Sequence, residues 1–516
     1  MADADRTQTD ADAYEAARPE WQQKFNVFCE NWLFAFLIAM AVRHFVIEPF
    51  RIPTTSMEPM LYGDPSFTKG DLVVVDKIWS RLTGLHRWDV AVFQFPLPEL
   101  EAPKADARPA LNENGDRLDD PLLHPLLNRS FVKRIIGTPG DKFYISAGNY
   151  YVQQPDGSFQ VCRRPAAVQE VMWDPVYRHG AQPGYLPWEA TAKAVVKAEG
   201  GALKLDIPAG GNVMFTQPLI NLYLKPGEFQ VASVYTKQYQ VRRLSQTEPA
   251  FELDGQQGNA WDVGKWLIKR LNSADLADLD NARSSGRNAD EIGRPLNDVG
   301  NESVADLRWT MVPTDISGRI EFRYQIGTER FVLEFFPDRW RLLINEVERD
   351  AGAESPRQHR FALARVDDDV ALVLDGKERI RLAMPPVAVV SLPVTVSWAG
   401  EGTIALANLE CDRDVHYCVR GFLQAGLPGS SYLQDTQARA LIAGKSYANM
   451  STKELASPIA VSPATAQTIP AGCFLMMGDN SMVSWDCRNW GYVPAENFRG
   501  RAWIVAFPFP RCRVIR

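Results

Sequence analysis

The longest apolar stretch of the chain lies near its N-terminus, at residues 28–47. Its uninterrupted core, residues 32–42, is shorter than the ~20 residues that cross a bilayer. A span must therefore include a Glu-Asn pair at one end and an Arg-His pair at the other, whose polar groups can reach the headgroups. The pattern predicts one transmembrane helix at 28–47, preceded by a disordered polar tail at 1–27. A buried helix of a soluble protein is the alternative.

Two further features of this region bear on its role. No small-x-small sequence follows the apolar stretch, so it is not typical of a cleavable signal peptide. Basic residues stand on both sides of it, Arg18 and Lys24 before and Arg43 and Arg51 after. Charge alone therefore does not predict the orientation of the helix in a membrane.

Beyond this segment, apolar and polar residues alternate with the period of β-strands. The alternation is clearest in residues 318–420, where Asp375-Gly376 is typical of a hairpin turn. It predicts a β-sandwich or jelly roll there, only loosely similar to lectin-like modules. Trp340 and Trp398 fall within alternating runs and are expected in its core. Residues 231–241 are also strand-like, and residues 272–301 are loop-like.

Composition narrows the possible functions. A chain of 516 residues is expected to form two or three folded units. The net charge of −7 and the lack of a basic run argue against nucleic acid as a partner. Seven cysteines leave at least one thiol unpaired, and Cys411 and Cys418 flank a short segment that a disulfide could close. No C-x-x-C motif occurs, so no zinc site is expected.

Two segments offer a nucleophile and a base. Pro53 and Pro59 restrict the backbone around Ser56, whose hydroxyl needs a base to become nucleophilic. Lys133 lies in an apolar strand pattern, with Phe131 and Ile135 on the same face. Poor hydration lowers the pKa of a lysine, and the neutral amine can take a serine proton. None of the six histidines is paired at short spacing with a plausible serine.

A third segment follows an apolar strand pattern at residues 473–477. It begins with the turn Gly478-Asp-Asn480 and continues with Ser484, Asp486 and Arg488. Asp486 and Arg488 are two residues apart, so they could share a face and form an ion pair. Ser484 could reach an amine and orient it.

Together these segments resemble the type I signal peptidases, the leader peptidase family of membrane-bound Ser/Lys proteases. The resemblance covers residues 28–145 and 470–510, and includes G-D-L-V-V-V-D-K at 70–77, R-W-D-V-A-V-F at 87–93, K-R-I-I-G-T-P-G-D at 133–141 and the final G-D-N…S-x-D-x-R block. Thr55, Ser481 and Cys487 depart from residues that are common in that family.

The resemblance implies a role for each matched residue. Ser56 falls on the nucleophile, Lys133 on the general base, Thr54 on an oxyanion donor and Ser484 on the serine that orients the lysine. Four residues are expected to support the site structurally: Asp486, Arg488, Asp479 and Asn480. Val132 and Met57 are expected to line the substrate pocket. No cofactor or metal is implied.

The resemblance also implies a setting. The catalytic domain lies outside the bacterial cytoplasmic membrane, the tail 1–27 lies inside, and the substrates are exported preproteins cut after small-x-small. The implied fold is mainly β: a single transmembrane helix, then a mostly antiparallel catalytic domain in two parts, 48–165 and 441–516. Residues 166–440 form an inserted β-rich domain, either a structural elaboration or a binder of glycan, preprotein or an envelope partner.

Two rival hypotheses remain. A self-cleaving repressor shares the Ser/Lys chemistry, but it would be soluble and would carry a DNA-binding helix pair. A membrane-tethered envelope-binding protein with a lectin-like β-sandwich would have no protease activity, and would not need Ser56 or Lys133.

Overall fold

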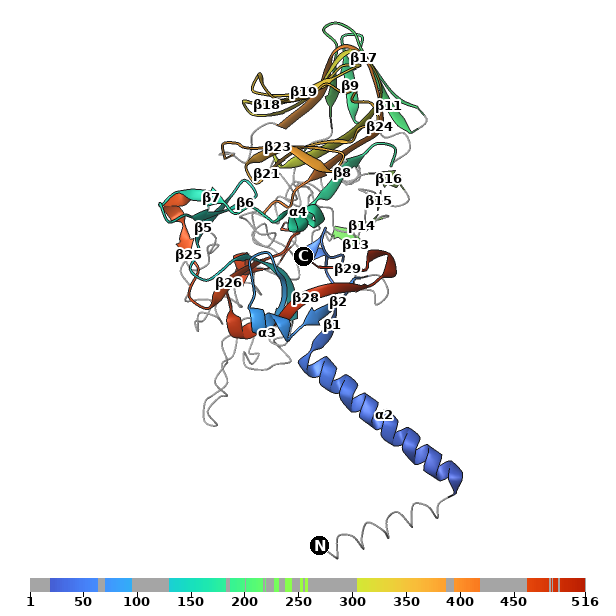
Figure 1. The fold of residues 1–516 in the computed structure, drawn as a ribbon, viewed down its shortest axis with the longest axis vertical. Helices are drawn as coiled ribbons and strands as arrows, with labels where there is room; N and C mark the ends of the chain where they lie inside the picture. The colour runs from blue at the N-terminus through green and yellow to red at the C-terminus, as the bar shows by residue number, and fades with distance from the viewer. Residues whose placement is uncertain are drawn as a thin grey trace, which may run out of the picture.

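The computed structural model describes much of the chain: residues 19–63, 70–94, 130–181, 186–199, 201–216, 219, 227–231, 237–243, 251–253, 256–258, 304–386, 394–417, 462–481, 484, 486–490 and 492–515. These residues are mainly β-strand, with one long apolar helix at the N-terminal end (Figure 1). The predicted tail at 1–18, the loop at 272–301 and Cys418 lie outside the described residues.

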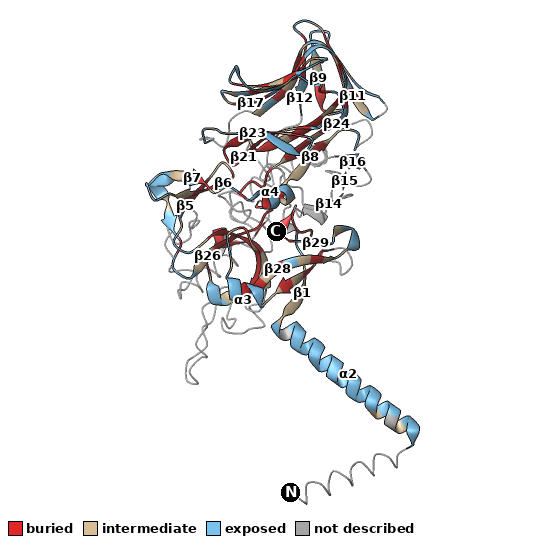
Figure 2. Ribbon diagram, in the orientation of Figure 1, coloured by how far each residue is buried: buried red, intermediate tan, exposed pale blue. Residues whose placement is uncertain are grey.

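The N-terminal helix is longer than predicted. Helix α2 spans Glu20–Phe45, so the expectation of a disordered tail up to residue 27 is wrong for residues 20–27. The sequence of α2 has no Gly or Pro, and Lys24 pairs with Glu20 one turn earlier at 2.7 Å, which favours helix at this end. Its stretch Glu20–Arg43 is long and apolar enough to cross a membrane. The side chains along it are largely exposed (Figure 2).

An antiparallel sheet of eight strands follows α2 and combines both ends of the chain. Its order is β1-β2-β28-β3-β4-β26-β27, with β29 paired to β28. The strands are β1 Ile47–Arg51, β2 Leu72–Asp76, β3 Val90–Gln94, β4 Ser130–Gly137, β26 Cys473–Met477, β27 Val493–Pro494, β28 Phe498–Phe507 and β29 Arg513–Val514. The N-terminal strands therefore lie beside the C-terminal ones, as the blue and red ribbons in Figure 1 show.

Two apolar clusters pack this sheet. One includes Met57, Val73 and Val505, with Val132 partly buried against it. The other includes Phe93, Ile135 and Met476. Phe131 and Val132, neighbours on β4, pack against different clusters, because successive side chains point to opposite faces of a sheet.

Shorter elements surround this sheet. Helices α3 Trp79–Thr83, α4 Ala166–Met172 and α9 Cys487–Trp490 are each at most seven residues long, and the 3-10 turn η1 spans Thr55–Met57. A second sheet has the order β25-β5-β6-β7, with β25 Gln467–Thr468, β5 Lys142–Ser146, β6 Asn149–Gln153 and β7 Phe159–Val161. A third, also of four strands, contains β13 Gly227–Val231, β14 Lys237–Arg243, β15 Phe251–Leu253 and β16 Gln256–Gly258.

The largest sheet has 13 strands and is built on two long ones, β17 Leu307–Ile326 and β24 Val394–Arg413. They pair along almost their whole length, with register shifts between Val312 and Asp315. On one side of these shifts β17 pairs with β21, and on the other with β18. The remaining strands are β8 Asp174–Arg178, β9 Trp188–Thr191, β10 Val195–Glu199, β11 Ala202–Ile207, β12 Asn212–Phe215, β18 Glu329–Phe335, β19 Trp340–Ile344, β20 Val347–Gly352, β21 Phe361–Val366, β22 Asp369–Leu374 and β23 Lys377–Ala383.

Several sequence predictions for this sheet are confirmed. Asp375 and Gly376 form the turn between β22 and β23, with φ of 50° and 77°, which is the conformation of a tight hairpin turn. Trp340 and Trp398 are buried in the core of the sheet. By contrast, Cys411, on β24, is a buried free thiol, so it does not form the disulfide that the sequence allowed.

A buried cluster of charges joins the 13-stranded sheet to the rest of the chain. The guanidinium of Arg164, between β7 and α4, donates to Asp367 at 2.7 Å and to Asp414 at 2.5 Å. Arg164 also lies over the rings of Trp88 and Tyr417. Arg164 and Asp414 are almost fully buried, so each charge is stabilised by the other and not by water.

Candidate functional site

The loop that carries Ser56 is tied to the neighbouring strands by its backbone. The N–H of Ile52 donates to the carbonyl of Asp71, and that of Leu61 to the carbonyl of Met57. The buried carboxylate of Asp71 accepts from the N–H of Tyr62 at 2.9 Å and pairs with Arg511 at 2.7 Å. The loop is thus held at both of its ends, and η1 within it presents Ser56.

Lys133 lies in the middle of β4, opposite Ala91 of β3. Its ammonium nitrogen is 2.5 Å from the hydroxyl oxygen of Ser56. Both side chains are buried, and the exposed fraction of Lys133 is 3%. A serine and a lysine 77 positions apart in the sequence are therefore in direct contact.

Burial lowers the pKa of Lys133 to about 8, because a buried ammonium loses its hydration. Asp486 and Asp479 act to raise this pKa, and Arg488 acts to lower it. These carboxylates already have arginine partners, so they do not restore the pKa to its ordinary value. The neutral fraction of Lys133 near physiological pH is therefore much larger than that of an ordinary lysine, although the ammonium form still predominates.

The turn after β26 contacts Ser56 through its backbone. The N–H of Asn480 donates to the carbonyl oxygen of Ser56 at 3.1 Å. A Cβ at Gly478 would lie 2.4 Å from that carbonyl oxygen and 2.2 Å from the hydroxyl of Ser484. Only glycine therefore leaves room for Ser56 and Ser484 to approach this turn.

Two buried ion pairs surround the site. Asp486 and Arg488 pair at 2.8 Å, as their spacing predicted, but Asp486 directly precedes helix α9 and Arg488 lies within it, so they do not share a strand face. Burial acts to raise the pKa of Asp486, yet the nearby Arg488 holds it below its ordinary value. The other pair, between Asp479 and Arg134, has two hydrogen bonds, of 2.8 and 2.6 Å.

Arg134 is the functional candidate that the sequence reasoning missed. Its side chain is fully buried and also donates to the carbonyl oxygen of Trp88 at 2.7 Å. Burial acts to lower its pKa, but Asp479 raises it above its ordinary value. The available signal was an arginine inside an apolar strand, which requires a buried carboxylate as partner.

The two predicted hydroxyl groups differ in their surroundings. Thr54 is an exposed residue, and its hydroxyl is 3.3 Å from that of Ser56. The hydroxyl of Ser484 is buried, and among the described residues it has no hydrogen-bond partner of normal geometry. It is nevertheless near enough to Asp486 to help lower the pKa of that carboxylate. No hydrogen bond between Ser484 and Lys133 is present in the described part of the chain.

Val132 and Met57 belong to the same apolar cluster, next to Lys133 and Ser56 in sequence. Met57 is 1% exposed, whereas Val132 is only partly buried. Of these two residues, Val132 has the more accessible side chain. In the described ranges, no three His, Cys, Asp or Glu side chains are grouped to hold a metal ion.

Comparison with known proteins gives a family match at both ends of the chain. Residues 26–170 and 424–507 match the family described as signal peptidase, peptidase S26. A probable signal peptidase I-2 from Synechocystis sp. is 33% identical over 118 residues, which are 23% of this chain and 41% of the relative. Signal peptidase I from Leptolyngbya laminosa is 38% identical over 90 residues, 17% of this chain and 40% of the relative. The matches thus span less than half the length of these relatives.

Two solved structures that match the chain do so at low identity. The carbohydrate recognition domain of Emp46p is 9% identical with a TM-score of 0.21, covering 44% of this chain and 88% of that domain. The carbohydrate binding module CBM66 from Bacillus subtilis is 12% identical with a TM-score of 0.18, covering 22% of this chain and 78% of the module. Similarity this weak carries no argument about ligands.

Proposed function

We propose that this chain, whose residues 26–170 and 424–507 match the signal peptidase family, peptidase S26, is a membrane-bound serine endopeptidase that removes signal peptides from exported preproteins. The observation that carries the proposal is the buried 2.5 Å contact between the Lys133 amine and the Ser56 hydroxyl. In this account Ser56 is the nucleophile and neutral Lys133 is the general base.

The reaction begins with a proton transfer. Neutral Lys133 takes the proton of Ser56 while the serine oxygen attacks the carbonyl carbon of the scissile peptide bond. The oxyanion that forms accepts a hydrogen bond from Thr54, whose hydroxyl is 3.3 Å from that of Ser56. Lys133 then gives its proton to the leaving amine, and the signal peptide remains as an ester on Ser56. A water molecule, activated by Lys133, hydrolyses the ester.

The buried charges support this chemistry by cancelling each other. Asp486 with Arg488 and Asp479 with Arg134 are ion pairs, and although both carboxylates act to raise the pKa of Lys133, that pKa stays at about 8. The Asp479–Arg134 pair also positions the turn whose Asn480 N–H donates to the carbonyl of Ser56. We assign Asp479, Asn480, Asp486 and Arg488 to support of the site.

Ser484 is assigned the role of orienting Lys133 during the reaction. A buried hydroxyl without a partner costs about 1–3 kcal/mol, and Ser484 is such a hydroxyl in the described part of the structure. When Lys133 becomes an ammonium ion, it can donate to the Ser484 hydroxyl, which satisfies both groups. Val132 and Met57 are assigned to the wall that receives the small residue before the cleaved bond.

The proposed setting follows from the helix. Helix α2 crosses the cytoplasmic membrane, with the tail 1–27 in the cytoplasm, its helical end Glu20–Val27 included, and the catalytic residues outside. The catalytic domain is proposed to comprise 48–165 and 441–516, with residues 166–440 as an inserted β-rich domain. The insertion is a structural elaboration in this proposal, built on the long paired strands β17 and β24.

Thr54 gives a graded test of the oxyanion assignment. Thr54→Val is expected to lower kcat about 10²- to 10³-fold, the usual effect of losing one oxyanion donor. Thr54→Ser keeps the hydroxyl and should stay within a few-fold of the wild type. Steady-state kinetics with a signal-sequence peptide measure both variants. Equal activity of the valine and serine variants would remove Thr54 from the mechanism.

The function itself is tested with a preprotein and the detergent-solubilised chain. Mass spectrometry of the products is expected to find one cut, directly after a small-x-small sequence. The matched control is the same preprotein with phenylalanine in place of the small residue before the cut, and it should not be cleaved. If the intact preprotein persists under conditions where α2 is in detergent, the non-enzymatic envelope-binding hypothesis gains support instead.

A further inference from the structure

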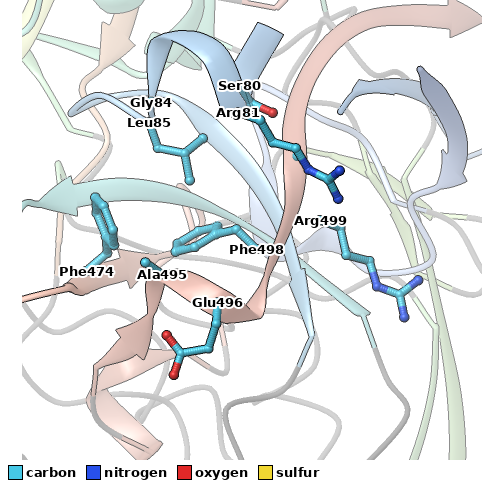
Figure 3. Close-up of a pocket in the computed structure, with 10 residues that line it drawn as sticks. Ser80, Arg81, Gly84, Leu85, Phe474, Ala495, Glu496, Phe498 and Arg499 are labelled. Atoms are coloured by element: carbon cyan, nitrogen blue, oxygen red, sulfur yellow. The ribbon is translucent and has the colours of Figure 1, made fainter. Parts of the chain in front are cut away.

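A cleft beside α3 is built from residues that the proposed chemistry does not use. It has a volume of about 430 Å³ and is lined by Ser80, Arg81, Gly84, Leu85, Phe474, Ala495, Glu496, Phe498, Arg499 and Gly500 (Figure 3). Its lining therefore combines apolar side chains, two arginines and one glutamate. Ser56 and Lys133 are not among these residues.

Backbone pairing places this cleft close to the exit of α2. The N–H of Lys77 donates to the carbonyl of Val46, the residue directly after α2. In the sheet, Asp76 lies opposite both Ile47 and Arg501. Helix α3 begins three residues after Asp76, and Arg499 precedes Arg501 by two. Arg81, in α3, and Arg499, in β28, are thus each within five residues of a position in the sheet that lies beside the end of α2.

The charges in the cleft are separated. Figure 3 shows the side chains of Arg81 and Arg499 directed to one side, while Glu496 points away from them and Phe474 and Phe498 lie on the side away from the two guanidinium groups. Among the described residues no carboxylate pairs with Arg81, and Arg499 lies 3.7 Å from Glu48. Two guanidinium groups near one another favour a phosphate. Glu496 repels an anion from the opposite end.

Helix α3 adds an exposed apolar surface next to the arginines. Ile78, Trp79 and Leu82 are 42%, 56% and 72% exposed. Tryptophan is enriched at the level of the lipid headgroups, and leucine and isoleucine can enter the acyl region. The adjacent guanidinium groups would then lie at the depth of the phosphates.

We propose that the cleft between α3 and the start of β28 binds the headgroup phosphate of an anionic phospholipid through Arg81 and Arg499, while α3 rests in the membrane surface. The site depends on the proposed insertion of α2 in a bilayer, but not on the peptidase activity. It is a specific site and not a general attraction, because the whole chain carries a net charge of −7. Binding of the phosphate would hold the eight-stranded sheet at a fixed height above the bilayer.

The test uses the full chain with Ser56→Ala, so that lipid binding is measured without any cleavage. The protein is placed in nanodiscs of phosphatidylcholine with or without phosphatidylglycerol, and lipid retained after detergent extraction is counted by native mass spectrometry. Arg81→Ala with Arg499→Ala is expected to weaken phosphatidylglycerol retention about 25-fold, since each arginine at an anionic surface contributes about five-fold. The matched control, Arg330→Ala with Arg339→Ala, removes two exposed charges of the 13-stranded sheet and should leave retention unchanged.

Equal loss of retention in both double variants, or no loss in either, would overturn the site. A second measurement needs no arginine variant: brominated acyl chains should quench the part of the fluorescence that Trp79→Phe removes. Absence of that quenching would show that α3 does not rest in the membrane, and would also contradict the proposal. Soluble glycerol phosphate serves as a competitor, and displacement of the lipid by it at equal concentration would indicate a site for free phosphate instead.

Discussion

Ser56→Ala and Lys133→Met are each expected to lower the rate of preprotein cleavage by about 10⁴-fold or more. The reason is the direct contact between the two side chains, which lie 2.5 Å apart in a buried site. A serine hydroxyl is a weak nucleophile without a base. In the proposed mechanism no other base replaces Lys133, because the nearby Asp479 and Asp486 are paired with arginines.

Lys133→Met retains the length of the side chain and removes only the amine, so the variant should fold. Lys142→Met is a matched control, because Lys142 is exposed at the start of β5 and should stay fully active. Cleavage is measured as a single-turnover rate with enzyme in excess over preprotein. Because the two residues act as one unit, the double variant should be no slower than either single variant. Wild-type rates in either single variant would exclude the Ser56–Lys133 mechanism.

Arg164→Leu is expected to lower the free energy of unfolding by about 3–5 kcal/mol, the usual effect of removing one partner from a buried ion pair. Arg164 contacts both Asp367 and Asp414, and its loss leaves two buried carboxylates without a positive partner. Burial already raises the pKa of Asp414 to about 7, and Arg164 acts to lower it. The substitution also removes the stacking of Arg164 on Trp88 and Tyr417.

The adjacent Arg163 is the control for Arg164. Its side chain is 47% exposed, and its partner Asp369 also lies 3.5 Å from Arg381. Arg163→Leu should therefore cost at most about 1 kcal/mol. Denaturant unfolding followed by tryptophan fluorescence compares the two variants. Similar unfolding midpoints for both would mean that Arg164 does not join the 13-stranded sheet to the neighbouring elements.

Local patterns predicted local structure well. Alternation indicated the strands of the 13-stranded sheet, and Asp375-Gly376 indicated its hairpin turn, because side-chain periodicity and turn conformation depend on nearby residues. The start of α2 was missed, since polar residues at 20–27 suggested a tail although nothing in them interrupts a helix. Hydropathy indicates which residues lie within the lipid, but it does not indicate how far the helix continues beyond the lipid.

Ion pairs between residues far apart in the chain could not be predicted from the sequence. The contact of Arg134 with Asp479 joins residues 345 positions apart, and that of Arg511 with Asp71 joins residues 440 apart. A single sequence holds no information on which arginine meets which carboxylate across such distances. The pairing of Asp486 with Arg488 could be predicted because the two are neighbours in the chain. The family resemblance supplied the remaining site residues, including Ser484, whose contact with Lys133 stays a prediction.

The pH dependence of kcat/KM tests the central claim most directly, because it reports the ionisation of the free enzyme. The amine of Lys133 must be neutral to accept a proton, and burial lowers its pKa to about 8. The rate should therefore rise about ten-fold per pH unit at low pH, bend near pH 8 and level off above it. A rate that stays flat from about pH 6 to 10, or that bends only near the ordinary lysine value of about 10.4, would contradict a buried lysine base.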